Sequence, residues 1–418
     1  MNEKIDYVIR VLDSPLEVNA ADWNTLLATQ SPDGMLNPFL RHEYLAAMHQ
    51  SDSASPKTGW TPRFITLWDG ATLAAGCALY LKDHSYGEYV FDHAWANAYH
   101  QHGLPYYPKA LIAPPFTPVP GPRLLARNSA ERLLLVKTVI AWCDENKLSS
   151  LHLLFSADDD VKACEEAGLM LRHTVQFHWT NTEPGYATFE EFLMSLAQEK
   201  RKKIRQERKK VAGAGITFRW AQGKDISNDD WDFFYECYER TYYEHGNAPY
   251  LSRDFFRRMQ DTMPENWLMF VAEHGGGEEK QQIATSLIAI SAISHWAEGQ
   301  NSIAKQSEKS ILTAYGRYWG ALARVDCLHF EACYYQPLQW CIEHGYKSFE
   351  GGAQGEHKMA RALLPVKTTS AHWLAHPSFA DAVERFLQRE GAGIENYMED
   401  LERRSPFKEL AGGKALLD

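Results

Sequence analysis

The chain lacks the features that mark secreted, membrane-spanning and disulfide-stapled proteins. Its N-terminal segment has no apolar core of the kind a signal peptide carries. The longest apolar run, near residues 283–293, is about half of the ~20 residues that a membrane helix needs. Cysteine is scarce, with 7 residues and no Cys-x-x-Cys, so a disulfide framework is not expected. These absences predict a cytoplasmic protein with no membrane span.

Several common catalytic signatures are missing as well. The sequence contains no His-Glu-x-x-His, no Gly-x-Ser-x-Gly and no Walker loop. His329-x-Glu331 resembles the His-x-Glu of zinc deaminases, but no Pro-Cys-x-x-Cys follows it. We therefore expect no metal site, and we look for chemistry that needs neither zinc nor a P-loop.

Positive charge is concentrated in one segment. The chain carries a net charge of −11, while residues 199–210 hold eight Lys or Arg and two Glu, which leaves −17 for the remainder. An acidic body argues against DNA binding. The segment reads as a helix that continues from Phe189, and it is either a solvated connector or a cation patch for phosphate groups. We favour the patch, with a coenzyme A pyrophosphate, a nucleotide-linked precursor or a tRNA as its ligand; its contacts would be Lys200, Arg201, Arg205 and Arg208.

The 418 residues contain a duplication. Residues 38–48 and 249–259 share the pattern Pro-aromatic-Leu-x-x-acid-aromatic-apolar-x-x-Met. Shorter matches follow in the same order, ending with His178-Trp179 and His372-Trp373, which are 194 residues apart. The first copy carries an extra Pro-rich loop near 104–124, and the second a polar insertion near 297–310. We predict a first module at 1–182, a basic connecting helix at 183–215, a second module at 216–376 and a C-terminal helical tail at 377–418.

Each copy predicts the same order of elements: helices, three antiparallel strands, a helix, a strand, a helix and a last strand. In the first copy we expect strands at 72–82 and 88–92 and a helix at 130–146. In the second, a helix at 330–344 should end at Gly345. The fold class is therefore mixed α/β, with tandem duplicated modules in which a mostly antiparallel sheet is flanked by helices. That order is the order of the GNAT acyltransferase module.

The densest group of polar residues lies in the second copy. Glu350-Gly-Gly-Ala-Gln354-Gly-Glu356-His357-Lys358 leaves a strand and enters a helix, where backbone N–H groups favour anions. His329 and Glu331 open the preceding helix. The corresponding first-copy positions are less polar, so we expect the second copy to carry the chemistry. The alternative is a capped helix with ordinary surface charges, and for His329 and Glu331 a packing role.

Longer motifs resemble the bacterial FemAB-like, or peptidoglycan biosynthesis/recognition, family of predicted N-acyltransferases in the GNAT superfamily. They run from about residue 31 to 401 and comprise 84–95, 106–109, 115–118, 176–179, 200–208, 315–320, 329–336 and 350–358. The resemblance implies two GNAT-like domains, as the duplication does independently. It also implies an acyl donor, either acyl-CoA such as acetyl-CoA or an aminoacyl-tRNA, with no permanently bound cofactor. The usual GNAT pattern Arg-x-x-Gly-x-Gly/Ala is approached by residues 317–322 but fails at Leu322, which argues against acetyl-CoA.

Taken together, the sequence predicts an N-acyltransferase that moves an acetyl or aminoacyl group to an amine, such as a cell-wall precursor or another amino compound. Such a reaction needs a base for the ammonium and donors for the oxyanion. Glu350, Glu356 and His357 are the candidate bases, with Glu331 as a further one. The expected substrate contacts are Tyr86, Glu88, Tyr315, Arg317, His329, Gln354 and Lys358. The alternative function is a muropeptide- or carrier-binding protein on a degenerate acyltransferase fold.

Overall fold

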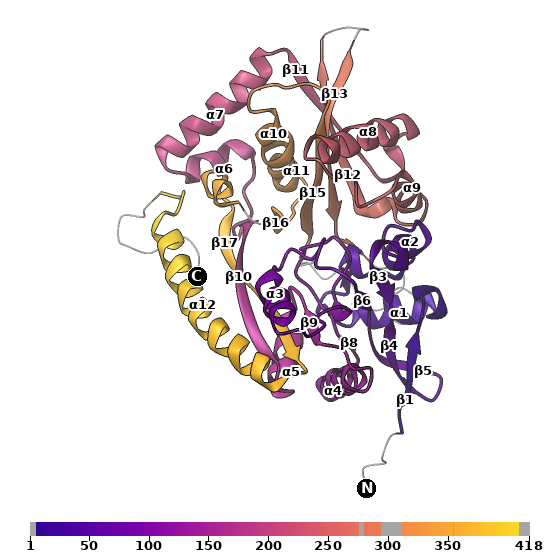
Figure 1. Cartoon of the computed structure of the whole chain (residues 1–418). Coiled ribbons are helices and arrows are strands. Elements are labelled where there is room, and N and C mark those ends of the chain that lie inside the picture. The colour runs from indigo at the N-terminus through magenta and orange to yellow at the C-terminus, as the bar shows by residue number, and fades with distance from the viewer. Residues whose placement is uncertain (1–5, 276–279, 294–310, 354, 409–418) are drawn as a thin grey trace.

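One sheet of eleven strands runs through the molecule (Figure 1). The computed structural model describes residues 6–275, 280–293, 311–353 and 355–408. The strand order of the sheet is β11-β12-β13-β15-β16-β10-β17-β9-β7-β6-β3. A second sheet, β1-β4-β5-β8, belongs to the first copy, and a two-stranded ribbon pairs β14 with β2. The predicted insertion at 297–310 lies outside the described residues, as does Gln354.

The first copy supplies the lower half of the molecule in Figure 1. Its helices are α1 (Ala20–Ala28), α2 (His42–Gln50), α3 (His93–Gln101), α4 (Ser129–Glu145) and α5 (Asp158–Glu166). Its strands are β1 (Val8–Leu12), β2 (Met35–Leu36), β3 (Trp60–Pro62), β4 (Phe64–Asp69), β5 (Thr72–Cys77), β6 (Leu79–Lys82), β7 (Lys109–Ile112), β8 (Leu125–Ala126), β9 (Ser150–Leu153) and β10 (Met170–Thr180).

The connecting segment and the second copy form the upper half, from which β17 and α12 run down beside the first copy (Figure 1). Their helices are α6 (Phe189–Ser195), α7 (Gln198–Gly213), α8 (Asn228–Glu244), α9 (Arg253–Thr262), α10 (Leu328–Phe330), a π turn (Glu331–Tyr335), α11 (Gln336–Glu343), a 3-10 turn (Glu356–Arg361) and α12 (Pro377–Arg403). The strands are β11 (Ile216–Gln222), β12 (Trp267–His274), β13 (Gln281–Ile290), β14 (Ala292–Ile293), β15 (Thr313–Ala321), β16 (Ser348–Glu350) and β17 (Leu364–Leu374).

The last strands of the two copies are exchanged. β10, from the first copy, pairs with β16 of the second, while β17, from the second copy, pairs with β9 of the first. β10 and β17 also pair with each other, and Thr174 lies opposite Thr368, exactly one repeat of 194 residues away. A pseudo-two-fold axis therefore passes between these two threonines, whose hydroxyl oxygens are 2.8 Å apart. The exchange confirms the predicted tandem modules; the division of the chain at 182, 215 and 376 stays a prediction.

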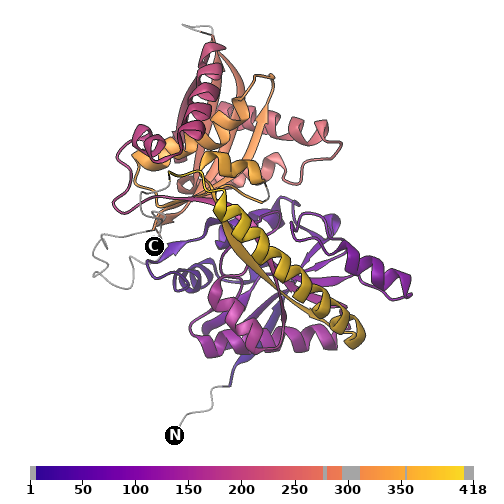
Figure 2. The same cartoon turned by 90° about the vertical axis from the view of Figure 1, so that its left-hand side faces the viewer.

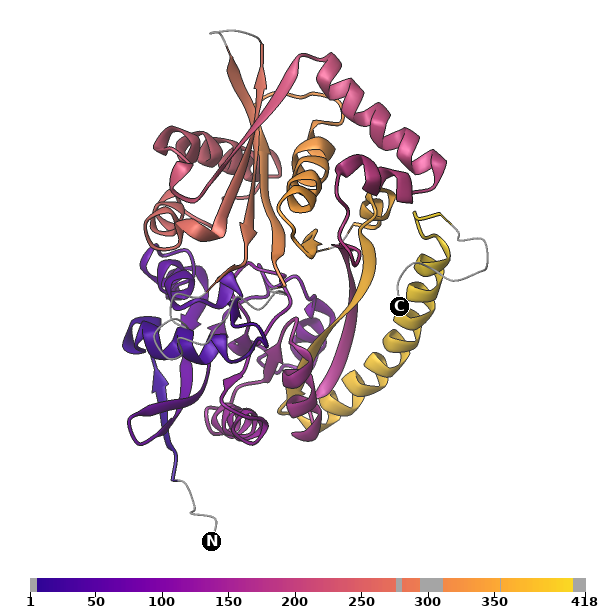
Figure 3. The same ribbon diagram turned by 180° about the vertical axis from the view of Figure 1, so that it is seen from behind.

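Helices cover both faces of the upper half of the sheet. Figure 3 shows α8 and α9 on one face and α10, α11 and α7 on the other. Strand alternation explains this arrangement, because Trp267 and Met269 of β12 pack into the cluster with α8 and α9, while Leu268 and Phe270 pack into the cluster with α6 and α11. Outside the exchanged strands lies α12, which crosses them from one half towards the other (Figure 2). An ion pair of 2.8 Å between Arg172 and Glu390 ties it to β10.

Three predicted elements are wrong. The strand expected at 72–82 breaks at Ala78, because β5 pairs with β4 and β8 in one sheet while β6 pairs with β3 and β7 in the other. Residues 88–92 form a loop before α3, since Gly87 and Tyr89 adopt positive φ angles of 80° and 63°. The helix expected to continue from Phe189 is interrupted at Leu196, which instead forms a β-bridge with Phe407.

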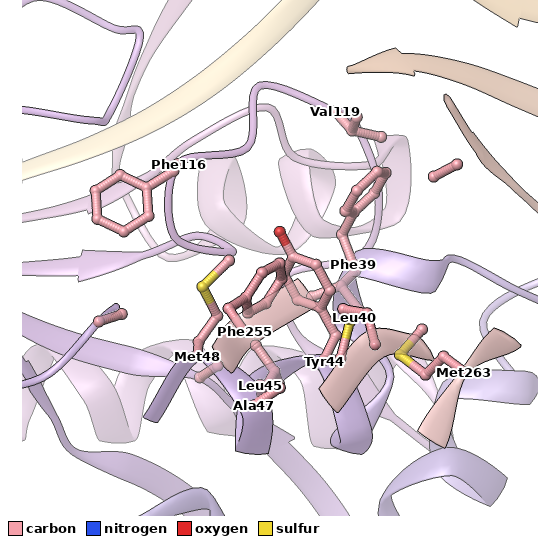
Figure 4. Close-up of a cluster of buried hydrophobic side chains, with 14 of the residues drawn as sticks. Phe39, Leu40, Tyr44, Leu45, Ala47, Met48, Phe116, Val119, Phe255 and Met263 are labelled. Atoms are coloured by element: carbon pink, nitrogen blue, oxygen red, sulfur yellow. The ribbon is translucent and has the colours of Figure 1, made fainter. Parts of the chain in front are cut away.

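An aromatic cluster joins the two copies directly (Figure 4). The ring of Phe39, in the 3-10 turn before α2, lies 5.4 Å from that of Tyr44 and 5.5 Å from that of Tyr315 on β15. Tyr44 in turn lies 5.4 Å from Phe255 on α9. All of these rings are at least nine-tenths buried, so the interface has the character of a hydrophobic core.

This cluster predicts that the two copies unfold together. Phe39→Ala should lower the free energy of unfolding by about 3–5 kcal/mol, because it leaves a cavity among fully buried rings. The control Phe91→Ala removes the same atoms from a side chain that is 55% exposed, and should change stability by less than about 0.5 kcal/mol. Chemical denaturation followed by circular dichroism measures both. Two separate transitions, only one of them shifted by Phe39→Ala, would contradict a shared core.

Candidate functional site

The site is built around Glu350, the last residue of β16. Its strand partners are His178 on β10 and Tyr315 on β15. Because paired residues point to the same face of a sheet, these three side chains share one face. The preceding residue, Phe349, packs into the cluster on the opposite face, with α6 and α11. Glu350 therefore faces the first copy.

The carboxyl of Glu350 is short of partners. Its Oε2 is buried, and no hydrogen-bonding group in the described residues reaches it. Burial raises the pKa of Glu350 to about 8, and the positive charge of Arg123 opposes that shift without cancelling it. A carboxyl with such a pKa can release and take up a proton near neutral pH.

Arg123 comes from the Pro-rich loop of the first copy. Its guanidinium is held by two carbonyls, with Nε 2.7 Å from the oxygen of Leu154 and Nη2 2.6 Å from that of Val119. Its Nη1 is buried and has no partner in the described residues. Burial lowers the pKa of Arg123 to about 10, while Asp160 and Glu350 act to raise it. Each copy thus contributes to the junction one ionisable side chain with a buried atom that has no hydrogen-bond partner in the described residues.

The strands separate directly beyond Glu350. β15 and β16 run parallel and are paired over three residues, ending with Tyr315 and Glu350. The chain then turns away at Gly351 and Gly352. A Cβ at Gly351 would lie 2.6 Å from Leu363, so a side chain there would force its neighbours to shift, and the φ of 76° at Gly352 favours glycine. Beyond Tyr315, the edge of β15 that faced β16 has no strand partner in the described chain, so its N–H groups are candidate donors for an oxyanion.

Arg317 sits at a β-bulge on the other edge of β15, where this strand pairs with β13. Ile288 of β13 pairs with Gly316 and Leu287 pairs with Tyr318, which leaves Arg317 as the extra residue. A bulge of this kind redirects a side chain out of the regular alternation. Nη2 of Arg317 donates to the carbonyl of Phe116 at 2.6 Å. The Pro-rich loop of the first copy therefore contacts Arg317 directly, and through Arg123 it places a positive charge that acts on Glu350.

Lys358 and His178 border the same region. Nζ of Lys358 donates to the carbonyls of Gly352 and Ala353, at 3.0 and 3.2 Å, and so holds the turn after β16. Burial lowers the pKa of Lys358 to about 8. Burial and the charge of Lys358 lower the pKa of His178 to about 4, so that imidazole is neutral at physiological pH.

The other predicted bases lie elsewhere. Glu356 is exposed and pairs with Arg404 and Tyr397 of the C-terminal helix region, and the bond from Arg404 lowers its pKa. His357 contacts the hydroxyl of Tyr334 at 3.3 Å. Glu331, in the π turn, is buried and pairs at 3.0 Å with Arg208, one of the predicted phosphate contacts.

The remaining predicted contacts are dispersed. His329 is exposed and packs beside Trp319. Tyr86 is 65% exposed, whereas Glu88 is buried and paired with Lys109 at 2.7 Å. Of the predicted site residues, the structure gathers Glu350, Tyr315, Arg317 and Lys358 around the separation of β15 and β16.

Residues of α7 serve two purposes. On its inner side, Arg208 pairs with Glu331, and Glu207 accepts from both Arg361 and Tyr335, so the helix is fixed to the π turn. On its outer side, a shallow hollow of about 330 Å³ is lined by Gln198, Arg201, Lys202, Arg205, Gln206 and Lys209. Lys200 pairs with Glu199, and Arg205 with Glu190. We call this outer side the α7 cationic face.

Sequence reasoning missed Arg123 and the role of His178. Nothing in the local pattern around Arg123 marked it, because it reaches the site through a loop. The repeat did carry a usable signal. His178 corresponds to His372, 194 residues later, and Glu350 corresponds to His152, 198 residues earlier. Both pairs are opposite each other in the sheet, His178 with Glu350 and His372 with His152. In the first copy, however, the two imidazoles contact each other at 2.8 Å in a closed buried network.

Two negative findings apply to the described residues. No three His, Cys, Asp or Glu side chains among them are arranged to share a metal ion. None of the helices in this part of the chain is long and apolar enough to cross a membrane.

The pKa of Glu350 predicts a pH dependence of stability. Below about pH 4.3, the pKa of an exposed Glu, the carboxyl is protonated in both the folded and the unfolded state. Its contribution to the free energy of unfolding is then at its full value. This contribution to stability is lost as pH rises through about 8. The unfolded chain releases the proton at a lower pH than the folded protein does, and that release favours unfolding. Between about pH 5 and 9, Glu350→Gln should therefore lose less free energy of unfolding than the wild type, while Glu356→Gln, at an exposed position, should follow the wild type. Parallel curves for Glu350→Gln and the wild type would contradict the buried carboxyl.

Comparison with known proteins agrees with this architecture. FemX aligns with a TM-score of 0.51 and 10% identity, over 88% of this chain and 98% of its own. The C-terminal domain of an Agrobacterium fabrum protein assigned as a lysylphosphatidylglycerol synthetase aligns with a TM-score of 0.51 and 11% identity, over 88% and 96%. A tandem GNAT protein from the clavulanic acid biosynthesis pathway aligns at 0.46 and 9%, over 89% and 99%. At such identities the likeness concerns the fold.

No curated protein matches the chain. The model of the FemAB-like family, described as peptidoglycan biosynthesis/recognition, matches residues 14–409. That span includes the first copy except β1, the connecting helices, the second copy and α12. The chain therefore belongs to the FemAB-like family.

Proposed function

We propose that this protein is an N-acyltransferase that uses Glu350 as its base. The observation that carries the proposal is the buried, unpartnered Oε2 of Glu350 at the point where β15 and β16 separate. A pKa of about 8 leaves a useful fraction of the carboxylate ionised near neutral pH, and makes it basic enough to take a proton from an ammonium group.

The reaction would be direct acyl transfer. The ammonium of the acceptor gives one proton to Glu350, and the freed nitrogen attacks the carbonyl carbon of an acyl thioester or ester. The N–C bond forms and the carbonyl oxygen gains negative charge, which free N–H groups on the edge of β15 would stabilise. The C–S or C–O bond then breaks, and the leaving thiolate or alkoxide takes up the second proton that the attacking nitrogen releases as the amide forms. Neither a metal nor a permanently bound cofactor takes part in these steps.

The donor's phosphates would bind on the α7 cationic face, on the side of the sheet opposite to Glu350, so its acyl group would have to pass the separation of β15 and β16 to reach the base. The lining residues of this hollow include Arg201, Lys202 and Lys209, and none of these three has an ion pair to a carboxylate in the described residues. An acyl-CoA and an aminoacyl-tRNA both present phosphates, so the face is compatible with either donor. The family description favours a peptidoglycan precursor as the acceptor.

Glu350→Gln tests the base directly. The amide keeps the shape of the side chain but accepts no proton, so the rate of transfer should fall by at least about 100-fold. In the wild type, the rate should rise with pH up to about 8 and then level off, and this rise should be absent in the variant. Mass spectrometry of candidate amines, after incubation with acyl-CoA or charged tRNA, reports the added acyl group.

The matched control is Glu356→Gln, an exposed carboxylate a few residues away, which should retain activity within about 2-fold. Full turnover by Glu350→Gln would remove Glu350 from the role of base. Absence of an added acyl mass with every donor, together with retained binding of muropeptides, would instead establish the non-catalytic binding function.

Charge reversal on α7 tests the donor surface. Replacing Arg201, Lys202 and Lys209 by Glu should raise the KM for the donor at least about 10-fold, and should flatten its dependence on salt. The KM for the acceptor should be unchanged. The control replaces the exposed Lys57, Lys137 and Lys162 of the first copy, which alters net charge equally. An equal effect of both triple variants would show that the α7 cationic face has no specific role.

A further inference from the structure

We infer that Arg317 forms a carboxylate-binding subsite, so that the acceptor is an amine that also carries a carboxylate. The inference rests on the proposed function, because it assigns the second group of the same acceptor. It also has a binding test that does not depend on turnover.

Arg317 is a half-buried cation without a counter-ion. In the described residues no carboxylate lies within 4 Å of its guanidinium, which donates a hydrogen bond to the carbonyl of Phe116. Its Nε is buried and has no partner. An arginine has five N–H donors, and leaving a buried donor unpaired is costly. The position therefore suits a ligand that supplies the missing negative charge.

Aromatic rings from both copies form the walls. The guanidinium lies 5.5 Å from the ring of Phe39 and 5.2 Å from that of Tyr318. On the first-copy side, Phe116 stacks on Tyr250 of the second copy with ring centres 4.7 Å apart. Such walls lower the local dielectric, which strengthens a bond between guanidinium and carboxylate.

A buried ionic cluster positions one further wall. Nζ of Lys109 contacts Glu88 at 2.7 Å and also contacts Asp92, and these three side chains are almost completely buried. They hold the loop that presents Tyr89, which lies near enough to Arg317 to interact with it electrostatically. The buried Glu88 thus acts as a positioning residue for this loop.

The charge and spacing favour a carboxylate over a phosphate. The titratable groups that most affect Arg317 are Tyr44, Tyr89 and Tyr318, so the subsite offers one positive charge, whereas a phosphate dianion would call for more. Arg317 is two residues along β15 from Tyr315, the strand partner of Glu350, a rise of about 7 Å. This spacing fits an amine and a carboxylate of one amino acid or of the end of a short peptide.

The test compares acids with their amides in the absence of any acyl donor. Saturation-transfer NMR measures the binding of glycine, alanine and glycylglycine to the full chain, each paired with its C-terminal carboxamide. The wild type should bind the acids about 10- to 100-fold more tightly, as expected for a charge-assisted hydrogen bond. Arg317→Met should abolish this preference, Arg317→Lys should retain part of it, and the exposed Arg324→Met should leave it intact.

The outcomes separate the subsite from the reaction. Glu350→Gln should keep the preference for acids, since it removes the base and leaves Arg317 in place. A wild-type preference for acids without acyl transfer would overturn the proposed reaction and keep the subsite. Equal binding of acids and amides by the wild type, including no binding of either, would overturn the subsite even if Arg317→Met failed to fold. Tighter binding of 2-aminoethyl phosphate than of any acid would overturn the assignment to a carboxylate.

Discussion

The structure depends on the exchange of β10 and β17 between the two copies. Backbone hydrogen bonds between β10 and β16, and between β17 and β9, turn what would be two separate sheets into one sheet of eleven strands. Because each last strand completes the sheet of the other copy, neither copy can bury its central strands alone. The exchange also places His178, a first-copy residue, beside Glu350, a second-copy residue.

The pseudo-two-fold axis relates two centres that have diverged. Around the axis at Thr174 and Thr368, Glu350 and His178 on one side correspond to His152 and His372 on the other. The histidine pair is sealed: burial lowers the pKa of His152 to about 3, and Trp95 stacks over it. The glutamate side instead faces separating strands, glycines and an unpaired arginine. In the proposed function, duplication thus provides one copy for stability and one for chemistry, held in a fixed relation by the exchanged strands.

The sequence was most informative where it repeats. Matching segments predicted two modules, and the 194-residue spacing of His178 and His372 is the spacing that the axis at Thr174 imposes. Glu350 was among the candidate bases because its neighbouring glycines signalled a special turn. The exchange itself was not predictable from the sequence, because a strand with the same alternating pattern could pair with the sheet of either copy. Arg123 was missed because loop 113–124 folds against the other copy, and the loop at 88–92 because its conformation follows from the burial of Glu88 and Asp92 beside Lys109.

The central claim is that strand exchange creates a buried carboxyl with a raised pKa at the junction of the copies. It is measured most directly by NMR titration of protein labelled with ¹³C at the glutamate carboxyl carbons, with Glu350→Gln to assign the resonance. The account predicts one glutamate resonance that titrates near pH 8, and that is absent from the variant. If the resonance that Glu350→Gln removes titrated below about pH 5, as exposed carboxylates do, the account would be contradicted.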